Sequence, residues 1–493
     1  MPTMVIDGRE VTAPPGANLI EAAKLAGIEI PHFCYHPALK VVASCRMCFV
    51  EVTQEVRGKA TTRLTTACNT PAADGMVVRT DTQPVKKAQN DILEFLLINH
   101  PVDCPVCDEA GECKLQDYAF AYGTASSRFA EHKRFRHAKK LGSGIRLYTN
   151  RCILCDRCVR FLRDFVGTGE LSVTDMGNGN EISVFPGRPI DNVLAGNLPE
   201  ICPVGALISE DFLFKARVWN LSAVDSVCPG CSRGCATSLD VKDNEVQRTR
   251  ARENQAVNGY FICDDGRYLY HVIRHETRLE HPAVREGDQL RESNWDHALD
   301  VVVSRLAEFP ERIVILLSPF LTQEEVRAGA DLSEVLRGSV LGHVPNAVQE
   351  APVLFPGGFA IDGDKAPNST LVKNIAPVPL QELAITKDTV VLFFNSSLRT
   401  GSVSPLDAEK LRRAGFVAVI DVLRNDITAV ADVVLPGRMW AEKSGTFSNS
   451  AGMAQSFGAA VLPPPFTRDE SDVIRDLTRR ITTRISTGCG AKS

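Results

Sequence analysis

Cysteine is the residue type in this chain with the most chemical potential, and its distribution is uneven. The chain has 493 residues and 16 cysteines, of which 15 lie between Cys34 and Cys263. Disulfides are disfavoured in a reducing compartment, so clustered cysteines there indicate metal binding or catalysis. The sixteenth, Cys489, stands in a small, polar tail and is expected to be an unpaired thiol without function. The other fifteen fall into four groups along the chain.

The first group has the spacing C-x10-C-x2-C-x19-C. It consists of Cys34, Cys45, Cys48 and Cys68. The surrounding sequence predicts two strands around the Asp-Gly turn of "MVIDGREVTAP" (4–14), then a helix at 18–27 with a capping box, the cysteine loop and another strand. That order is similar to the order in plant-type [2Fe–2S] ferredoxins, although the cysteine spacing is looser. Four thiolates also suit zinc, so a structural zinc site is the alternative.

The second group, in "NHPVDCPVCDEAGEC" (99–113), has one thiolate too few. Its cysteines are Cys104, Cys107 and Cys113, and His100 precedes them. The apolar periodicity of 89–99 predicts a helix, so His100 lies just after a helix end, where a histidine usually meets solvent or the helix dipole. Every other group has four cysteines, and imidazole is an acceptable iron ligand. The fourth-ligand interpretation of His100 is therefore favoured over the solvent interpretation.

The third group is C-x2-C-x2-C with a distant Cys-Pro pair. Its members are Cys152, Cys155, Cys158 and Cys202. In bacterial two-cluster ferredoxins, C-x2-C-x2-C is completed by a distant Cys-Pro. Only one such triple is present here, so the pattern predicts a single [4Fe–4S] cluster.

The fourth group has the spacing C-x2-C-x3-C-x27-C, which is not a zinc-ribbon spacing. Its members are Cys228, Cys231, Cys235 and Cys263. Together with the three groups before it, this one accounts for fifteen cysteines.

The cysteine-poor part of the chain after about residue 275 shows an alternating pattern. A helix is predicted at 293–308, and strands are predicted at 313–317, 389–394 and 415–421, with helical stretches between them. This alternation is typical of an α/β domain. The expected fold class is therefore multidomain, α+β in front and α/β behind.

Composition excludes several classes of function. The net charge of −5 gives no reason to expect nucleic acid as a partner. The longest apolar runs are far shorter than a membrane span, and the N-terminus is charged, so we expect a cytoplasmic protein. No G-x-G-x-x-G follows a predicted strand, which argues against NAD or FMN on this chain.

The four groups in this order resemble the large iron–sulfur subunit of respiratory complex I, the NADH:quinone oxidoreductase. The resemblance implies a [2Fe–2S] cluster at the first group and three [4Fe–4S] clusters at the others, with His100 as a ligand of the second. The segment 431–455 is similar to part of the molybdopterin-dependent oxidoreductases, which in this family implies a truncated domain without molybdenum. Asn449 and Gln455 are polar residues of that segment, and we favour a loop-holding role for them over cofactor contact.

The resemblance implies an electron carrier of a translocating respiratory enzyme, with no substrate site of its own. Its partners would be a flavin subunit that binds NADH, a small [2Fe–2S] subunit and iron–sulfur subunits on the quinone side. It would lie peripherally on the cytoplasmic face of the inner membrane, bound through the complex. The alternative is an electron-transfer subunit of a soluble NAD-linked formate dehydrogenase or hydrogenase, which share the same front end. A largely structural role is a further alternative for the back half.

The same reasoning divides the chain into five expected domains. They are a [2Fe–2S] ferredoxin-like domain (1–80), a His-containing [4Fe–4S] domain (81–120), a ferredoxin-like [4Fe–4S] domain (121–218), a molybdopterin-oxidoreductase type [4Fe–4S] domain (219–275) and the truncated α/β domain (276–493).

Overall fold

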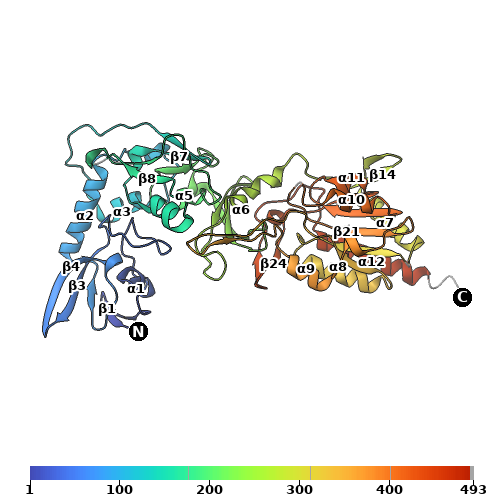
Figure 1. Cartoon of the computed structure of the whole chain (residues 1–493), viewed down its shortest axis with the longest axis horizontal. Helices are drawn as coiled ribbons and strands as arrows, with labels where there is room; N and C mark the ends of the chain where they lie inside the picture. Colours follow the sequence, from blue (N-terminus) through green and yellow to red (C-terminus); the bar gives the residue numbers. More distant parts are fainter. Residues whose placement is uncertain (176, 311, 400, 489–493) are drawn as a thin grey trace. The chain divides into compact units, whose positions relative to one another are not determined.

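The computed structural model describes residues 1–488 except 176, 311 and 400 (Figure 1). The chain forms two compact units. The first comprises Met1–Leu221 with the short segment Phe355–Gly358, and the second comprises Ser222–Leu354 and the chain from Phe359 onward. The first three cysteine groups lie in the first unit and the fourth group lies in the second. Cys489 is outside the described residues.

The N-terminal part of the first unit is a β-grasp domain. Helix α1 (Leu19–Leu25) packs on a five-stranded sheet of order β2-β1-β5-β3-β4. Its strands are β1 (Thr3–Ile6), β2 (Arg9–Thr12), β3 (Phe49–Val56), β4 (Lys59–Thr66) and β5 (Val77–Arg79). The predicted hairpin and capping box are both confirmed: Asp7 and Gly8 have positive φ, as a two-residue hairpin turn requires, and the Asn18 side chain caps the helix while Glu21 bonds back to it.

The rest of the first unit consists of short elements around the second and third groups. Its helices are α2 (Gln83–Leu97), α3 (Lys114–Tyr122), α4 (Arg157–Arg160), which continues into the π-helical turn η4 (Phe161–Val166), and α5 (Asn197–Ile201). Its strands are β6 (Lys139–Gly142), β7 (Ile145–Leu147), β8 (Leu171–Thr174), β9 (Glu181–Val184) and β10 (Leu207–Ser209). The predicted helix at 89–99 exists, but it begins six residues earlier, because Pro84 occupies its first turn, a favourable position.

The second unit begins with a small antiparallel sheet that carries the fourth group. Its strands are β11 (Ser222–Val227), β12 (Ala236–Lys242) and β13 (Glu245–Ala251), and helix α6 (Asp264–Tyr268) follows.

An eight-stranded sheet of order β15-β14-β23-β22-β21-β16-β17-β20 forms the centre of the second unit (Figure 1). Its strands are β14 (Ala283–Glu286), β15 (Gln289–Glu292), β16 (Ile313–Leu317), β17 (Val340–His343), β20 (Val378–Pro379), β21 (Val390–Phe394), β22 (Phe416–Asp421) and β23 (Val433–Pro436). The surrounding helices are α7 (Trp295–Glu308), α8 (Gln323–Val335), α9 (Ser369–Ile375), α10 (Pro405–Leu411), α11 (Asp426–Val430) and α12 (Glu470–Gly488). The α/β prediction and the three strands predicted from sequence are confirmed.

The six parallel strands of this sheet are connected in the doubly wound order. Chain order runs outward from β16 through β17 to β20, then returns to β21 on the other side of β16. In such sheets ligands bind at the carboxyl ends of the strands where the order reverses. Here that point lies between β16 and β21.

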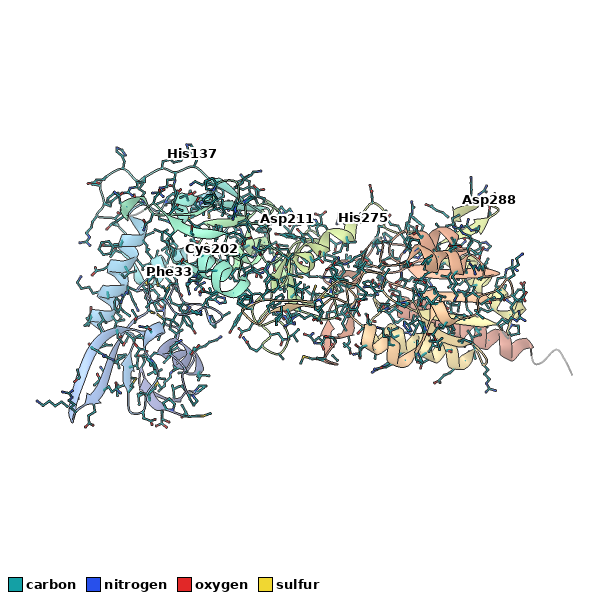
Figure 2. All side chains as sticks on the ribbon, in the orientation of Figure 1. Phe33, His137, Cys202, Asp211, His275 and Asp288 are labelled. Atoms are coloured by element: carbon teal, nitrogen blue, oxygen red, sulfur yellow. The ribbon has the colours of Figure 1, made fainter. Side chains whose placement is uncertain are left out.

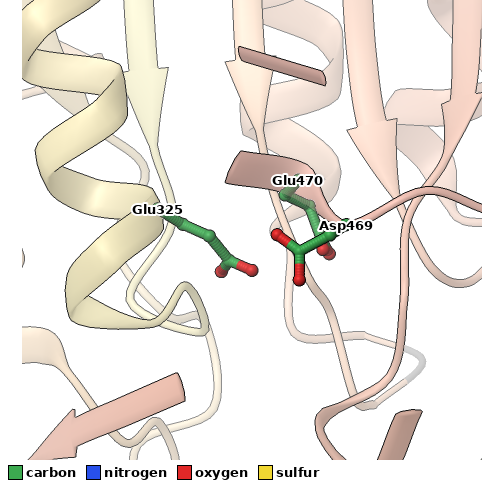
Figure 3. Close-up of side chains that lie close together, drawn as sticks. All are labelled: Glu325, Asp469 and Glu470. Carbon is green, nitrogen blue, oxygen red and sulfur yellow. The ribbon is translucent and has the colours of Figure 1, made fainter. Parts of the chain in front are cut away.

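The place where the strand order reverses is the topological switch point of the sheet. Charged side chains of the protein itself occupy it. Lys443 donates to Glu325 at 2.5 Å, to Glu470 at 2.8 Å and to Ser396, which follows β21, at 3.4 Å. Figure 3 shows the carboxylates of Glu325, Asp469 and Glu470 pointing toward one another. The Lys443, Glu325 and Glu470 side chains are 2% exposed or less. We call these three residues the Lys443 triad.

The charges of the triad depend on one another. Burial by itself lowers the pKa of Lys443, but the nearby carboxylates of Glu325, Glu470 and Asp469 outweigh burial and raise it, so the ammonium stays charged. Burial raises the pKa of Glu325 to about 8, although Lys443 opposes the shift. A single ammonium therefore stabilises two buried carboxyl groups.

Among the described residues, no helix is long and apolar enough to cross a membrane.

Removing the ammonium should destabilise the second unit. We expect Lys443→Met to lower the free energy of unfolding by about 3–5 kcal/mol, because two buried carboxyl groups lose their partner. The loss should be larger at pH 9 than at pH 6: the folded-state pKa of Glu325 is about 8 beside Lys443 and rises further without the ammonium, so above pH 8 the variant loses more stability with rising pH than the wild type does. Urea unfolding in a Trp219→Phe background would report on Trp295 and Trp440, the buried tryptophans of this unit.

The exposed Lys373 of the same unit provides the matched control. Lys373→Met should change stability by no more than about 0.5 kcal/mol. Equal effects of the two substitutions would contradict a stabilising role of the triad.

Candidate iron–sulfur centres

The structure gathers the four cysteines of the first group in one loop region beside the β-grasp sheet. Cys34, Cys48 and Cys68 are each 1% exposed, and the amide of Cys34 donates to the sulfur of Cys45 at 3.4 Å. The four thiols also hydrogen-bond among themselves: Cys45 and Cys68 lower the pKa of Cys34, and Cys68 lowers that of Cys48. Four neighbouring sulfur atoms of this kind could serve as the donor set of one metal centre.

The second group surrounds the end of α2 and the start of α3. Helix α2 ends at Leu97, so His100 lies just beyond it, as predicted, and Cys113 is the residue that precedes α3. Cys104 and Cys107 lie on one short turn, in which the Cys107 amide donates to the Cys104 carbonyl at 3.2 Å. Burial raises the pKa of Cys113 to about 11, with a smaller contribution from Cys107.

His100 has the properties that a neutral nitrogen ligand needs. Burial is the main cause that lowers its pKa to about 4, so the imidazole is uncharged near neutral pH. Its Nδ1 atom is buried without a hydrogen-bond partner. A buried ring nitrogen without a partner is costly unless something binds it, and a metal centre would satisfy it. The donor set of three thiols and one imidazole thus fits an iron–sulfur cluster.

The third group lines a single small pocket. All four cysteines, Cys152, Cys155, Cys158 and Cys202, contribute to its wall, together with apolar side chains such as Ile182 and Leu207. Two residues between the first three cysteines, Leu154 and Asp156, have positive φ, so the loop curls around the pocket. Burial raises the pKa of Cys152 to about 12, which keeps the thiol protonated until a metal displaces the proton.

The fourth group lies in the second unit between β11, β12 and α6. Its cysteines are buried, and the amide of Cys228 donates to the carbonyl of Cys235 at 2.8 Å. Cys263 precedes α6, and burial raises its pKa to about 11, with a further contribution from Cys231. The amide of Gly266 donates to the Cys263 sulfur at 3.4 Å, a type of bond that stabilises sulfur ligands of clusters.

Asn449 and Gln455 have the loop-holding role that the sequence favoured. The Asn449 side chain accepts from the amides of Ala451 and Met453, and Gln455 donates to the carbonyl of Gly234 at 2.6 Å. Asn449 therefore holds the turn at 449–453, and Gln455 supports the loop between Cys231 and Cys235.

Within the first unit, the third group contacts both other groups. The amide of Lys114, next to Cys113, donates to the carbonyl of Pro203, next to Cys202, at 3.1 Å. Gly205 lies so close to the second group that a Cβ atom there would be 2.3 Å from the sulfur of Cys107. The third group contacts the first group through Arg157 and Arg160 of α4, which donate to backbone carbonyl groups in the loop of the first group. Phe33 of the first group and Cys202 of the third are labelled in Figure 2.

Sequence reasoning did not identify the arginines that connect these groups. Arg151 donates to Asp103 at 2.6 Å and to the carbonyl of Gly205 at 3.3 Å, and so connects the second and third groups. The available signal was the arginine directly before Cys152 and before Cys158 in "RCILCDRCVR". Sequence alone does not tell whether such residues are solvated or buried.

Consecutive iron–sulfur domains in front of a molybdopterin-oxidoreductase-like α/β domain define the class of protein. Profiles of five protein families match it. They are a 2Fe-2S iron-sulfur cluster binding domain (2–83), the NADH-ubiquinone oxidoreductase-G iron-sulfur binding region (89–128), the ferredoxin-like domain of NADH-quinone oxidoreductase subunit 3 (142–208), the molybdopterin oxidoreductase Fe4S4 domain (221–275) and molybdopterin oxidoreductase (381–480).

Curated relatives agree with these matches. The chain is 36% identical over 341 residues to the NADH-ubiquinone oxidoreductase 75 kDa subunit of Reclinomonas americana, covering 69% of this chain and 48% of the relative. It is 38% identical over 329 residues to the mitochondrial NADH dehydrogenase [ubiquinone] iron-sulfur protein 1 of Solanum tuberosum, covering 66% of this chain and 44% of the relative.

A bacterial relative gives the same result. The chain is 38% identical over 322 residues to an NADH-quinone oxidoreductase subunit of Rickettsia typhi, a match that covers 65% of this chain and 47% of the relative. The iron–sulfur part of this chain is therefore homologous to that of the large iron–sulfur subunit of NADH:quinone oxidoreductases. The chain spans about half the length of the curated relatives that it matches.

A solved structure of an NAD+-reducing [NiFe]-hydrogenase in the H2-reduced state is 32% identical in sequence. The match covers 44% of this chain and 91% of that chain, with a TM-score of 0.39.

The ligand role of His100 can be tested by iron content. We expect His100→Ala to lose up to about four iron atoms per chain, because three thiolates do not complete the donor set. His100→Cys should keep the iron but lower the reduction potential, since histidine ligands raise it relative to thiolate. The exposed His132 provides the control, and His132→Ala should change neither quantity. Full iron content with an unchanged potential in His100→Ala would show that His100 is not a ligand.

Cluster binding at the fourth group can be tested with a substitution that leaves all four cysteines in place. A Cβ atom at Gly266 would lie 2.6 Å from the sulfur of Cys228, so Gly266→Ala should displace that sulfur and lower the iron content by about four per chain. At Gly458 a Cβ atom meets nothing within 4 Å, so Gly458→Ala is the control. Unchanged iron in Gly266→Ala would argue against a cluster at the fourth group.

Proposed function

We propose that this chain is the iron–sulfur electron carrier of an NADH:quinone oxidoreductase, passing electrons from a flavin subunit toward quinone. The observation that carries this proposal is the arrangement of three ligand groups within one unit, with the third in contact with the other two. The homology of the iron–sulfur part to the curated NADH-quinone and NADH-ubiquinone oxidoreductase proteins supports it.

The contacts support a particular order of electron transfer. The ligand loops of the first and third groups are bridged by arginines of α4, and those of the third and second by the bond from Lys114 to Pro203. The first and second groups instead meet through an aromatic contact, in which the ring centroids of Tyr118 and Phe33 lie 5.2 Å apart. We therefore propose the order first, third, second group.

In this function the clusters supply the one-electron redox chemistry, and the protein sets their surroundings. Apolar side chains around the third group exclude water from the pocket. Backbone amides, such as those of Leu154 and Gly266, donate to ligand sulfurs at 3.4 Å. Such burial and hydrogen bonding tune reduction potentials.

The proposal includes one [2Fe–2S] cluster at the first group and one [4Fe–4S] cluster at each of the others, with the domain limits given above. Its partners are a flavin subunit, a small [2Fe–2S] subunit and quinone-side iron–sulfur subunits, at the cytoplasmic face of the inner membrane. The back half holds no molybdenum in this proposal. The Lys443 triad occupies the switch point, and no cysteine lies between Cys263 and Cys489 to bind molybdenum.

Metal analysis tests the proposal directly. Iron, acid-labile sulfide and molybdenum should be measured together on the purified full chain. We expect about 14 iron atoms per chain, matched by sulfide in cluster proportion, and no molybdenum. NADH should reduce the clusters only after a flavin subunit is added. Molybdenum near one per chain would contradict the proposal and indicate a formate-dehydrogenase-like enzyme.

A further inference from the structure

Two arginines of helix α4 bury their guanidinium groups between the first and third cysteine groups. Arg157 is 5% exposed and Arg160 is 2% exposed. Arginine is almost never fully buried unless its charge is paired. The carboxylate of Asp156 lies 3.8 Å from Nε of Arg160, which is too long for a hydrogen bond, so the other contacts of both arginines need an explanation. They lie on either side of Cys158, a member of the third group.

Arg160 joins the backbones of both groups through one atom. Its Nη2 nitrogen donates to the carbonyl oxygen of Cys34 at 2.5 Å and lies 3.5 Å from that of Cys155. Its Nη1 nitrogen donates to the carbonyl of Lys40 at 2.6 Å, in the loop of the first group. The same side chain therefore holds one member of each group.

Arg157 makes a parallel connection. It donates to the carbonyl of Ile201, next to Cys202, at 3.1 Å and to the carbonyl of Tyr35, next to Cys34. The two guanidinium groups thus bind the loops of both sites at four backbone positions beside or at cysteines.

The arginines also place positive charge beside the sulfur atoms. Arg157 lines the pocket of the third group together with Cys155, Cys158 and Cys202. Both arginines bind carbonyl groups at or next to Cys34 of the first group. Their charges therefore lie near both groups, in an interior where charges are weakly screened.

We propose that Arg160, together with Arg157, is the positioning element that couples the first and third clusters, by holding their loops at a fixed separation and by raising the reduction potential of both. This inference rests on the proposed function. The step that it serves moves one electron from the reduced two-iron cluster, which is oxidised, to the four-iron cluster, which is reduced. No covalent bond changes, and no further reactant is needed.

The physical reason is that reduction adds one negative charge to a cluster. A buried cation beside it stabilises the reduced form and so raises the potential. Because the guanidinium cannot lose its proton, this contribution is permanent. Its planar fork also fixes the direction of several hydrogen bonds, which a flexible ammonium does not.

Redox titration of the full chain, followed by electron paramagnetic resonance, tests both parts. In Arg160→Met the potentials of the two-iron and third-group clusters should shift downward, and the magnetic interaction between the two reduced clusters should weaken. Arg160→Lys should retain potentials close to those of the wild type, because the charge remains, but should weaken the magnetic interaction, because the fork is lost. The signals of the second-group cluster should change less in both variants.

Arg163 on the same helical segment provides the matched control. It is exposed and pairs with the adjacent Asp164 at 2.8 Å, so Arg163→Met should leave both readouts unchanged. Unchanged potentials and magnetic interaction in both Arg160 variants would overturn the inference. If Arg160→Met fails to assemble, Arg160→Lys is the test. Retained potentials with a weaker magnetic interaction in that variant would support the inference, and no change in either quantity would overturn it.

The iron content of the wild-type chain distinguishes a failure of the proposed function from a failure of the role proposed for Arg160. If the wild type lacks clusters at the first and third groups, the proposed function fails. If the wild type carries them and the variants behave like Arg163→Met, only the role of Arg160 fails.

Discussion

Burial of cysteine thiols is the constraint on which the front of this structure depends. Eleven of the fifteen described cysteines are among the buried residues, and around most of them burial raises the thiol pKa. A metal centre binds thiolates, so it must displace protons that the buried sites retain. In the proposed function, a centre bridged by four side chains would add to the apolar core of these short elements, which includes Leu147, Phe161 and Leu198. The first unit outside the β-grasp has few long helices or strands, and its loops converge on ligand positions.

The sequence predicted the ligand groups and the elements that carry strong local signals. The hairpin at Asp7 and Gly8 and the capping box at Asn18 depend on neighbouring residues, so the sequence shows them. Cysteine spacing likewise reveals which residues can meet. The sequence did not show the early start of α2 at Gln83 or the burial of Arg157 and Arg160. These features depend on contacts between distant segments, such as Arg160 with Cys34, which local patterns do not contain.

The back half has a salt bridge at the place where doubly wound sheets usually bind a ligand. Its parallel strands keep the doubly wound order that usually creates a crevice for a nucleotide. Lys443, Glu325 and Glu470 fill the equivalent position with a salt bridge of their own. An ion pair of this kind specifies one arrangement of the surrounding helices, since each partner is costly to leave alone. The domain can therefore keep its shape without any bound molecule.

The segment from Cys202 to Gly205 is shared between two sites. Cys202 lines the pocket of the third group, Pro203 accepts a bond from Lys114 beside the second group, and Gly205 faces the sulfur of Cys107 at a distance that leaves no room for a methyl group. In the proposed function, a substitution in these four residues would have to suit two neighbouring clusters. The contacts of this short stretch therefore constrain its sequence from two sides.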